Sequence, residues 1–229
     1  MIYSRLNNLL FLKTRKTAGT SVELALRAVC GPRDIVTPVD EQGPSGVTEQ
    51  NYLMLRPDWR LKHRIRWTLG LRAPRFSPYI PIPDHMHAAD ARRLLGPKAF
   101  DAAYRFSIER NPWDRQVSNY FWQTRALPAE RKPSFAAWLH ADGPGLKIDN
   151  WQIYAIDGRV AVHKVLRYEH LAEDLAALAR EHGLKLPELP RAKGDLRPGG
   201  GYRDYYTPET RDLVASWYRN EIEAFGYEF

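Results

Sequence analysis

Cysteine is almost absent from this chain of 229 residues, in which Cys30 is the only one. A single thiol cannot form an internal disulfide, so the fold depends on a packed core, and this cysteine usage is typical of a reducing compartment. We therefore expect a cytoplasmic protein, with Cys30 as a small core residue on the first helix. The hydrophobic content of 44% and aromatic content of 12% are those of a globular protein. The length fits one domain over residues 1–229.

Long apolar runs are also missing. The apolar run Leu9–Leu12 near the N-terminus leads directly into Lys13. It is far shorter than the ~20 residues of a membrane span and too short for the apolar part of a secretion signal. We expect no membrane-spanning segment and no cleaved leader.

No group of metal-ligand residues stands out. His85 and His87 could place two ligands on one face of a strand, but no second His, Cys or Asp cluster follows at a suitable spacing. We therefore expect no metal. A neutral imidazole can instead take a proton from a hydroxyl, which makes His85 or His87 a candidate general base. The alternative is that these histidines flank or cap the short helix that ends at Gly96.

A phosphate-binding arrangement is what the N-terminal part does contain. Residues 8–31 read as a buried strand at Leu9–Leu12, a loop with small hydroxylated residues and three cations, and a helix that ends at Gly31. The free N–H groups and the dipole of a helix N-terminus attract anions. The loop is not a Walker A motif, because its lysine precedes its only glycine. The plainer interpretation is an ordinary turn in which a Thr or Ser caps the helix.

The same pattern recurs in the middle of the chain. Residues 104–108 alternate like a strand, and Asn111 with Pro112 predicts the start of a helix. Arg110 would then lie at the end of the strand and beside the helix N-terminus. Ser118 on that helix could share an anion with the Arg110 guanidinium, which is suited to forked contacts with phosphate. Glu109 or Asp114 could alternatively hold Arg110 in a structural salt bridge.

Residues 33–83 are irregular and rich in proline. Within them, residues 56–75 interleave arginine and lysine with tryptophan, leucine and isoleucine, a pattern suited to an anionic polymer or simply to a solvated surface. We interpret residues 33–83 as a possible substrate-binding insertion, because long irregular segments in compact domains are often functional. The net charge of +7 also favours an anionic ligand.

The last third of the chain predicts a strand over residues 160–166, an amphipathic helix over residues 169–182 and a last helix over residues 208–225. Between the two helices, residues 193–206 form a basic, glycine-rich loop with tyrosines. It could close over a nucleotide with an aromatic ring against the base, or it could be a flexible linker.

Together, the two loops and the histidine segment resemble the sulfotransferases that use 3′-phosphoadenosine 5′-phosphosulfate (PAPS), and most of all the carbohydrate branch that includes heparan sulfate 2-O-sulfotransferases and bacterial relatives. The matching stretches are FLKTRKTAGTSVE, the His85–His87 segment and FSIERNPWDRQVSNYFW. Residues 167–171 also match an R-x-E-x-L element. Where the familiar first loop has proline this chain has Arg15, which either leaves the loop less rigid or adds a contact to the sulfate.

The resemblance implies an α/β fold with three layers, similar to P-loop proteins, in which helices flank a central parallel sheet. It implies transfer of a sulfuryl group from PAPS to an acceptor hydroxyl on a sugar or glycan. His85 or His87 would be the base, with His85 the commoner family position, and Lys16 would stabilise the developing charge. The cofactor-binding residues would be Arg15, Lys16, Thr17, Ala18, Gly19, Thr20 and Ser21 at the 5′ side, with Arg110 and Ser118 at the 3′ side.

Two other functions are compatible with parts of this pattern. A nucleotide-dependent phosphotransferase would need Mg²⁺ and a carboxylate to hold it. A non-enzymatic module could bind nucleic acid or an anionic polysaccharide through residues 56–75, with steep salt dependence and no preference for an adenosine bisphosphate. The paired loops favour the sulfotransferase, so we expect no nucleic-acid partner. The acceptor and the oligomeric state are not encoded in any motif of the chain.

Overall fold

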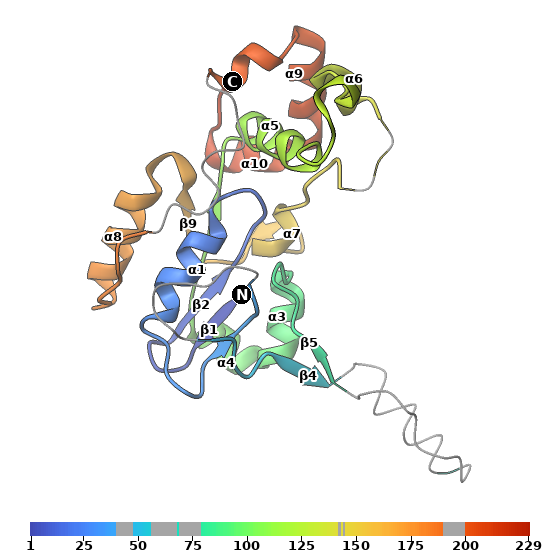
Figure 1. Ribbon diagram of the computed structural model, residues 1–229. Coiled ribbons are helices and arrows are strands. Elements are labelled where there is room, and N and C mark those ends of the chain that lie inside the picture. The colour runs from blue at the N-terminus through green and yellow to red at the C-terminus, as the bar shows by residue number, and fades with distance from the viewer. Residues whose placement is uncertain (40–47, 56–67, 69–78, 142, 144, 190–199) are drawn as a thin grey trace.

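The computed structural model describes residues 1–39, 48–55, 68, 79–141, 143, 145–189 and 200–229. Its centre is a sheet of five strands in the order β3-β1-β2-β6-β9. These strands are β1 (Ile2–Ser4), β2 (Leu9–Leu12), β3 (Ile35–Val36), β6 (Tyr104–Glu109) and β9 (Lys164–Arg167). The protein is therefore an α/β protein (Figure 1).

The sheet is mixed but mostly parallel. Strands β2, β6 and β9 run parallel to one another, with Leu10 opposite Arg105 and Ser107 opposite Val165. Strand β1 is antiparallel to both β2 and β3. The expectation of a central parallel sheet is met by β2, β6 and β9 but not by β1 and β3, because a short turn over residues 5–8 folds β1 back on β2 as a hairpin. Asp34 holds that turn by accepting hydrogen bonds from Ser4 Oγ and from the backbone N–H of Arg5.

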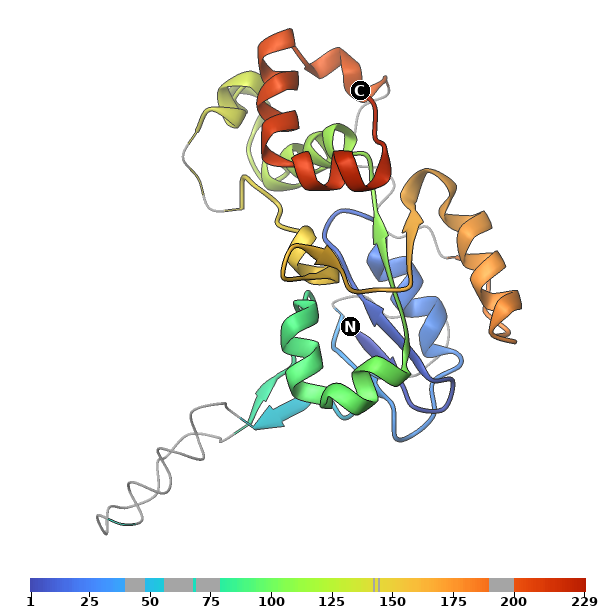
Figure 2. The same ribbon diagram turned by 180° about the vertical axis from the view of Figure 1, so that it is seen from behind.

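Helices cover both faces of the sheet (Figures 1 and 2). On one face, α1 (Gly19–Arg27) and α8 (Leu171–Glu181) pack with Phe11 and Phe106 in one apolar cluster. On the other face, Leu10 and Leu12 pack with residues of α3 (Ala88–Leu95) and α7 (Trp151–Tyr154), and α4 (Pro97–Ala102) lies beside α3. Alternate residues of β2 thus supply two cores, as the alternation of side chains along a strand requires.

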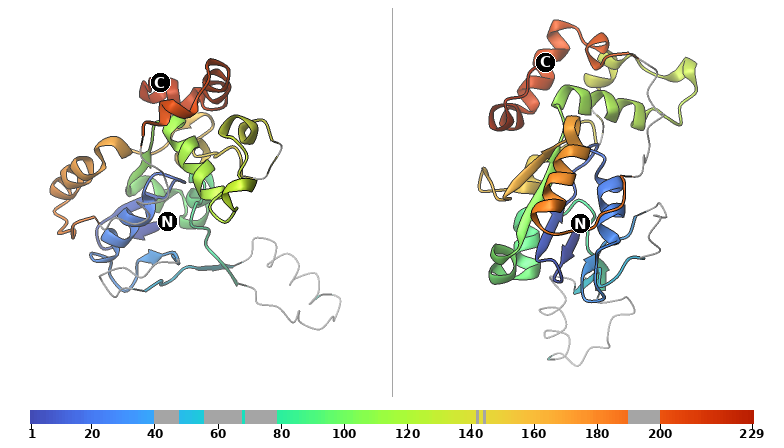
Figure 3. Two further views of the ribbon diagram at one scale, coloured as in Figure 1. Left: turned by 45° about the horizontal axis from the view of Figure 1, so that its top comes forward. Right: turned by 90° about the vertical axis from the view of Figure 1, so that its left-hand side faces the viewer.

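A third group of helices lies beyond the carboxyl ends of the parallel strands, as Figure 1 and the right-hand view of Figure 3 show. Its members are α5 (Pro112–Gln123), α6 (Phe135–Leu139), α9 (Pro208–Trp217) and α10 (Arg219–Phe225). They share an aromatic core that includes Trp113, Tyr120 and Trp138. This group closes the edge of the sheet at which the two predicted loops emerge.

Short elements complete the described part of the chain. Strands β4 (Leu53–Leu55) and β5 (Tyr79–Pro81) form one antiparallel pair, and β7 (Ala155–Ile156) and β8 (Arg159–Val160) form another. Single 3-10 turns span η1 (Ala129–Arg131), η2 (Tyr168–His170) and η3 (Tyr202–Tyr205). None of the helices within the described ranges is long and apolar enough to cross a membrane.

Several local predictions are confirmed. Strand β2 has the predicted bounds, and Asn111 caps α5 by accepting the N–H groups of Trp113 and Asp114, with Pro112 at the first helical position. Others need correction. The strand expected over residues 160–166 is two short strands, and the last helix is broken at Tyr218 into α9 and α10. Cys30 lies beyond the end of α1 and is only half-buried.

Candidate functional site

The two strand-to-helix loops line one cavity at the carboxyl edge of the sheet. The cavity has a volume of about 790 Å³. Its wall includes Lys16 from the loop after β2, Arg110 from the loop after β6 and Ser118 from α5, together with His85. All of the predicted binding residues therefore line this one space: Arg15, Lys16, Thr17, Ala18, Gly19, Thr20, Ser21, Arg110 and Ser118.

The loop after β2 has an unusual backbone. Lys16 and Ala18 adopt the left-handed conformation, with φ of 62° and 58°, which costs a non-glycine residue about 1–2 kcal/mol. Ala18 is the N-cap of α1 and provides no side-chain cap. The plainer interpretation, a turn capped by Thr or Ser, is therefore wrong. The N-terminus of α1 opens toward the cavity without a capping side chain, which is the arrangement that favours an anion.

Two hydroxyl groups of this loop, those of Thr14 and Thr17, form hydrogen bonds inside the protein. Thr14 Oγ1 donates to the carbonyl oxygen of Ile108 on β6, and it lies 2.8 Å from Thr17 Oγ1. Because Thr14 spends its proton on a carbonyl, Thr17 is the donor between the two hydroxyls. Thr17 is fully buried. The Thr17 hydroxyl therefore helps to fix the loop to β6 through Thr14.

Gly19 is needed for packing rather than for an unusual φ. A Cβ at this position would lie 2.8 Å from Lys13 Cγ and 3.3 Å from the Thr14 carbonyl oxygen. Lys13 is buried, and its Nζ lies 2.8 Å from Glu23 of α1 and 3.4 Å from Asp84. Lys13, one of the three cations of the loop, therefore forms ion pairs with two acidic residues of the protein itself. It joins the end of β2 to α1 and to the segment before His85.

Asn150, just before α7, also holds the loop, and no motif of the sequence singled it out. Its Oδ1 accepts from the backbone N–H of Arg15 at 2.9 Å, and its Nδ2 donates to the Arg15 carbonyl at 3.1 Å. Asn150 is fully buried. Both backbone groups of one loop residue are therefore fixed by a single amide.

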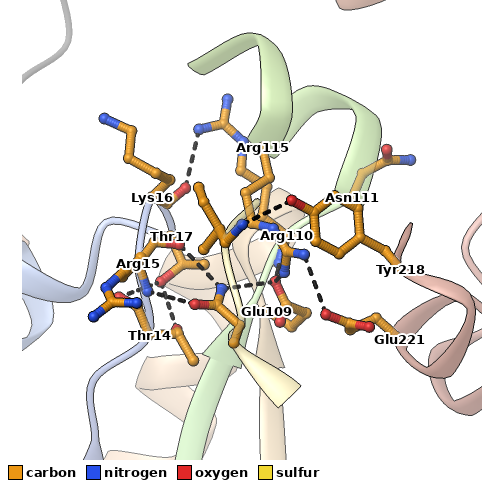
Figure 4. Close-up of polar contacts among 12 residues, drawn as sticks. Thr14, Arg15, Lys16, Thr17, Glu109, Arg110, Asn111, Arg115, Tyr218 and Glu221 are labelled. Carbon is orange, nitrogen blue, oxygen red and sulfur yellow. Dashed lines mark hydrogen bonds and ion pairs between the residues drawn. The ribbon is translucent and has the colours of Figure 1, made fainter. Parts of the chain in front are cut away.

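Arg110 bridges the two loops (Figure 4). Its Nη1 donates to the Lys16 carbonyl oxygen at 3.3 Å. Its Nη2 lies 2.7 Å from the Asp114 carboxylate, which confirms one of the two structural partners weighed for it. The guanidinium also lies 4.0 Å from the ring centroid of Tyr168. Asp114, which accepts from Nε and Nη2, and the ring of Tyr168 fix the plane of the guanidinium, and Nη1 is directed to the Lys16 carbonyl.

Below this bridge lies a buried ionic network. Glu109, at the end of β6, accepts from the backbone N–H of Arg110 at 2.8 Å and from Arg115 at 2.5 Å. Arg115 also contacts Glu221 of α10 at 3.2 Å. Tyr154 Oη and Asn150 Nδ2 complete the contacts of the Glu109 carboxylate. This one carboxylate is therefore connected to both loops, directly through Arg110 and through Asn150 to Arg15.

Burial and hydrogen bonding define the state of His85. Its Nδ1 lies 2.9 Å from the carbonyl oxygen of Lys13. A carbonyl only accepts, so Nδ1 carries the proton and Nε2 keeps its lone pair. Burial, followed by the charges of Lys13 and Arg15, lowers the pKa of His85 to about 4. The imidazole is therefore neutral at pH 7, with Nε2 as its proton acceptor.

His87 is placed differently. It is exposed, it is the N-cap residue of α3, and it is not among the described residues that line the cavity. The sequence left open which of the two histidines is the candidate base. Of the two, His85 is the one that lies beside the loops. His87 fits the alternative of a residue that flanks the helix.

Cations outnumber carboxylates on the cavity wall, and of these cations Lys13 and Arg110 are paired with acids. Among the described lining residues, the cations are Lys13, Arg15, Lys16, Arg110 and Lys147, against one carboxylate, Asp84. The ammonium of Lys16 lies 4.6 Å from the ring centroid of Trp122, which also lines the cavity. Trp122, Lys147 and Tyr168 had not been predicted as lining residues. Tyr168 follows Arg167 directly, so the R-x-E-x-L element marked its place.

The rest of that element is structural. Glu169 accepts from the backbone N–H of Asn111 at 2.7 Å, and Leu171 is buried against the sheet. The described tyrosines of the glycine-rich loop are also structural. Tyr206 donates to the Trp113 carbonyl at 2.9 Å, and Tyr202 and Tyr205 pack in the aromatic core around α5, away from the cavity lining. Residues 193–199 and, apart from Thr68, residues 56–75 lie outside the described residues.

Among the described residues, no group of three or more His, Cys, Asp or Glu is placed to hold a metal ion. A scan against models of protein families and a search of curated proteins gave no match to this chain.

Proposed function

We propose that this protein is a sulfotransferase that moves a sulfuryl group from PAPS to an acceptor hydroxyl, with a carbohydrate as the acceptor class. The observation that carries the proposal is the meeting of two strand-to-helix loops at one cationic cavity, with Arg110 Nη1 3.3 Å from the Lys16 carbonyl oxygen. PAPS carries anionic groups on both sides of its ribose. Two separate anion-binding loops on one wall suit such a ligand. We also propose that the three layers of the fold are similar to those of P-loop proteins.

The residues of the cavity have separate roles in binding the donor and in proton transfer. The uncapped N-terminus of α1 and Lys16 hold the 5′-phosphosulfate, where preorganised N–H groups and a cation stabilise the charge that grows on the leaving phosphate. Arg110 and Ser118 hold the 3′-phosphate. As the bond from sulfur to the acceptor oxygen forms and the bond from sulfur to the 5′-phosphate oxygen breaks, His85 Nε2 takes the acceptor proton.

The pKa of His85 also fits a role that depends on the ligand. A pKa of about 4 makes the ring neutral but a weak base at pH 7. Burial is the main cause of the low pKa, and an anion bound beside Arg15 would offset only the cationic charges that add to it, so the pKa of His85 would rise from about 4. The base would then be strongest when the donor is bound.

The decisive experiment compares ligands by thermal unfolding. We expect 3′-phosphoadenosine 5′-phosphate to stabilise the protein more than AMP or ATP, because neither AMP nor ATP has the 3′-phosphate that Arg110 and Ser118 would bind. A ligand at about 100 times its Kd adds roughly 2.7 kcal/mol to the free energy of unfolding. Equal stabilisation by the three ligands, or none, would overturn the proposal.

Metal dependence separates the proposal from the phosphotransferase alternative. Sulfuryl transfer carried by Lys16 and His85 should continue in EDTA. A requirement for Mg²⁺ together with stabilisation by ATP would instead favour phosphoryl transfer.

A further inference from the structure

We infer that Asn150 is a positioning residue that shapes the 5′-phosphosulfate subsite, although it lies outside the lining of the cavity. The inference rests on the proposed function. It starts from the two hydrogen bonds by which the Asn150 amide holds both the N–H and the carbonyl of Arg15, at 2.9 and 3.1 Å. This pair of contacts fixes the loop one residue before the left-handed Lys16.

The loop needs such support because its shape is costly. Two left-handed non-glycine residues, Lys16 and Ala18, persist only where the surroundings enforce them. Thr14 and Thr17 fix the loop to β6, Arg110 holds the Lys16 carbonyl, and Asn150 holds Arg15. The backbone N–H groups are thus held in place before a ligand arrives, which reduces the ordering cost of binding.

Asn150 reaches the other subsite only indirectly, through Glu109. Its Nδ2 lies 3.4 Å from Glu109 Oε1, and the same oxygen accepts the backbone N–H of Arg110. Asn150 has no described contact with Ser118 or with the Arg110 side chain. Loss of the amide should therefore damage the 5′ subsite and leave the 3′ subsite in place.

Two titrations test whether loss of the Asn150 amide weakens the 5′ subsite and not the 3′ subsite. For wild type and Asn150→Ala, the Kd of 3′-phosphoadenosine 5′-phosphate and the Kd of adenosine 3′-monophosphate are measured by calorimetry. The Kd of adenosine 3′-monophosphate divided by the Kd of 3′-phosphoadenosine 5′-phosphate reports how much affinity the 5′-phosphate adds. We expect this ratio to fall about tenfold in Asn150→Ala, while the Kd of adenosine 3′-monophosphate changes less than twofold. An equal loss for both ligands, or no change for either, would overturn the inference.

Gln116→Ala is the matched control. Gln116 is a fully buried amide on α5 that donates to the Leu146 carbonyl at 2.7 Å. Leu146 belongs to the segment that leads to Asn150, but Gln116 has no described contact with the loop after β2. It should lower thermal stability without changing the ratio of the two Kd values.

A measurement on the wild-type protein covers the case in which Asn150→Ala does not fold. Hydrogen exchange of the Arg15 amide, followed by NMR without ligand, should be strongly slowed by the bond to Asn150 Oδ1. Exchange at the rate of an unstructured peptide would refute the inference. If instead wild type binds neither adenosine ligand, the proposed function fails, while the exchange rate still reports on the Arg15 contact.

Discussion

At the scale of single residues, His85 and His87 provide the sharpest test because they are separated by one residue and have different surroundings. His85 Nδ1 bonds to Lys13 and the ring lines the cavity, whereas His87 is exposed at the start of α3. His85→Ala should abolish sulfuryl transfer while leaving the affinity for 3′-phosphoadenosine 5′-phosphate within about threefold, since it removes the base and not the phosphate contacts. Turnover assays and calorimetry measure the two effects.

His87→Ala is the control, and it should retain nearly full turnover. If His87→Ala were inactive and His85→Ala active, the roles assigned to the two histidines would have to be exchanged.

Lys16→Ala should lower turnover by on the order of 10²–10³, as expected for loss of a group that stabilises developing charge. Turnover assays measure this loss.

The lowered pKa of His85 also predicts a pH dependence of stability. Folding lowers this pKa from about 6.5 to about 4, so between these values the unfolded chain binds a proton that the folded protein does not. The free energy of unfolding should therefore fall as the pH falls through this window. Compared with His85→Asn, wild type should lose about 2 kcal/mol more between pH 7 and pH 5. Urea unfolding at the two pH values measures this difference, and parallel losses would contradict the burial of His85.

At the scale of elements, the turn from β2 into α1 depends on the absence of a side chain at Gly19. In Gly19→Ala, the new Cβ would lie 2.8 Å from Lys13 Cγ, in the middle of a side chain that is held by Glu23. We expect a loss of roughly 1–3 kcal/mol in the free energy of unfolding, typical of overpacking, together with weaker binding of the 5′-phosphate. Gly143→Ala is the comparison, because no atom of the described residues beyond its chain neighbours lies within 4 Å of its Cβ position. Similar stabilities for the two variants would contradict this account.

Local signals are what made the elements predictable. The apolar run at Leu9–Leu12 and the Asn111-Pro112 pair each act within a few residues, so β2 and the start of α5 follow from the sequence alone. Strand β1 was not foreseen, because three residues carry too little periodicity and its pairing depends on Asp34. The break of the last helix at Tyr218 likewise depends on tertiary contacts, since the Tyr218 hydroxyl bonds to Gln116 and Ile148.

The same distinction applies to the candidate site. Lys16, Arg110, Ser118 and His85 could be chosen beforehand because each belongs to a short motif with a chemical reason. The residues that hold these side chains and loops in place could not be predicted from the sequence. Asn150 contacts Arg15 across 135 positions of the chain, and only the fold brings the two together.

At the scale of the whole molecule, Arg115 connects the sheet to the C-terminal helices. Its guanidinium is fully buried between Glu109 at the end of β6 and Glu221 of α10, and it lies 4.4 Å from the ring centroid of Tyr218. Because Glu109 also contacts Arg110 and Asn150, this ion cluster supports both loops of the cavity at once. Arg115 is therefore the residue whose loss should affect stability and ligand binding together.

Arg115→Met should lower the free energy of unfolding by about 3–5 kcal/mol, because it leaves two buried carboxylates without their cation. Arg93→Met provides the contrast, since it breaks only the exposed pair with Asp90 and should cost no more than about 0.5 kcal/mol. Burial already raises the pKa of Glu221, and loss of the guanidinium would raise it further. Carboxyl groups with a raised pKa in the folded state favour folding as the pH falls, so the gap between Arg115→Met and wild type should narrow from pH 7.5 to pH 5. A gap that stays constant over this range would mean that Glu221 does not depend on Arg115 for its charge.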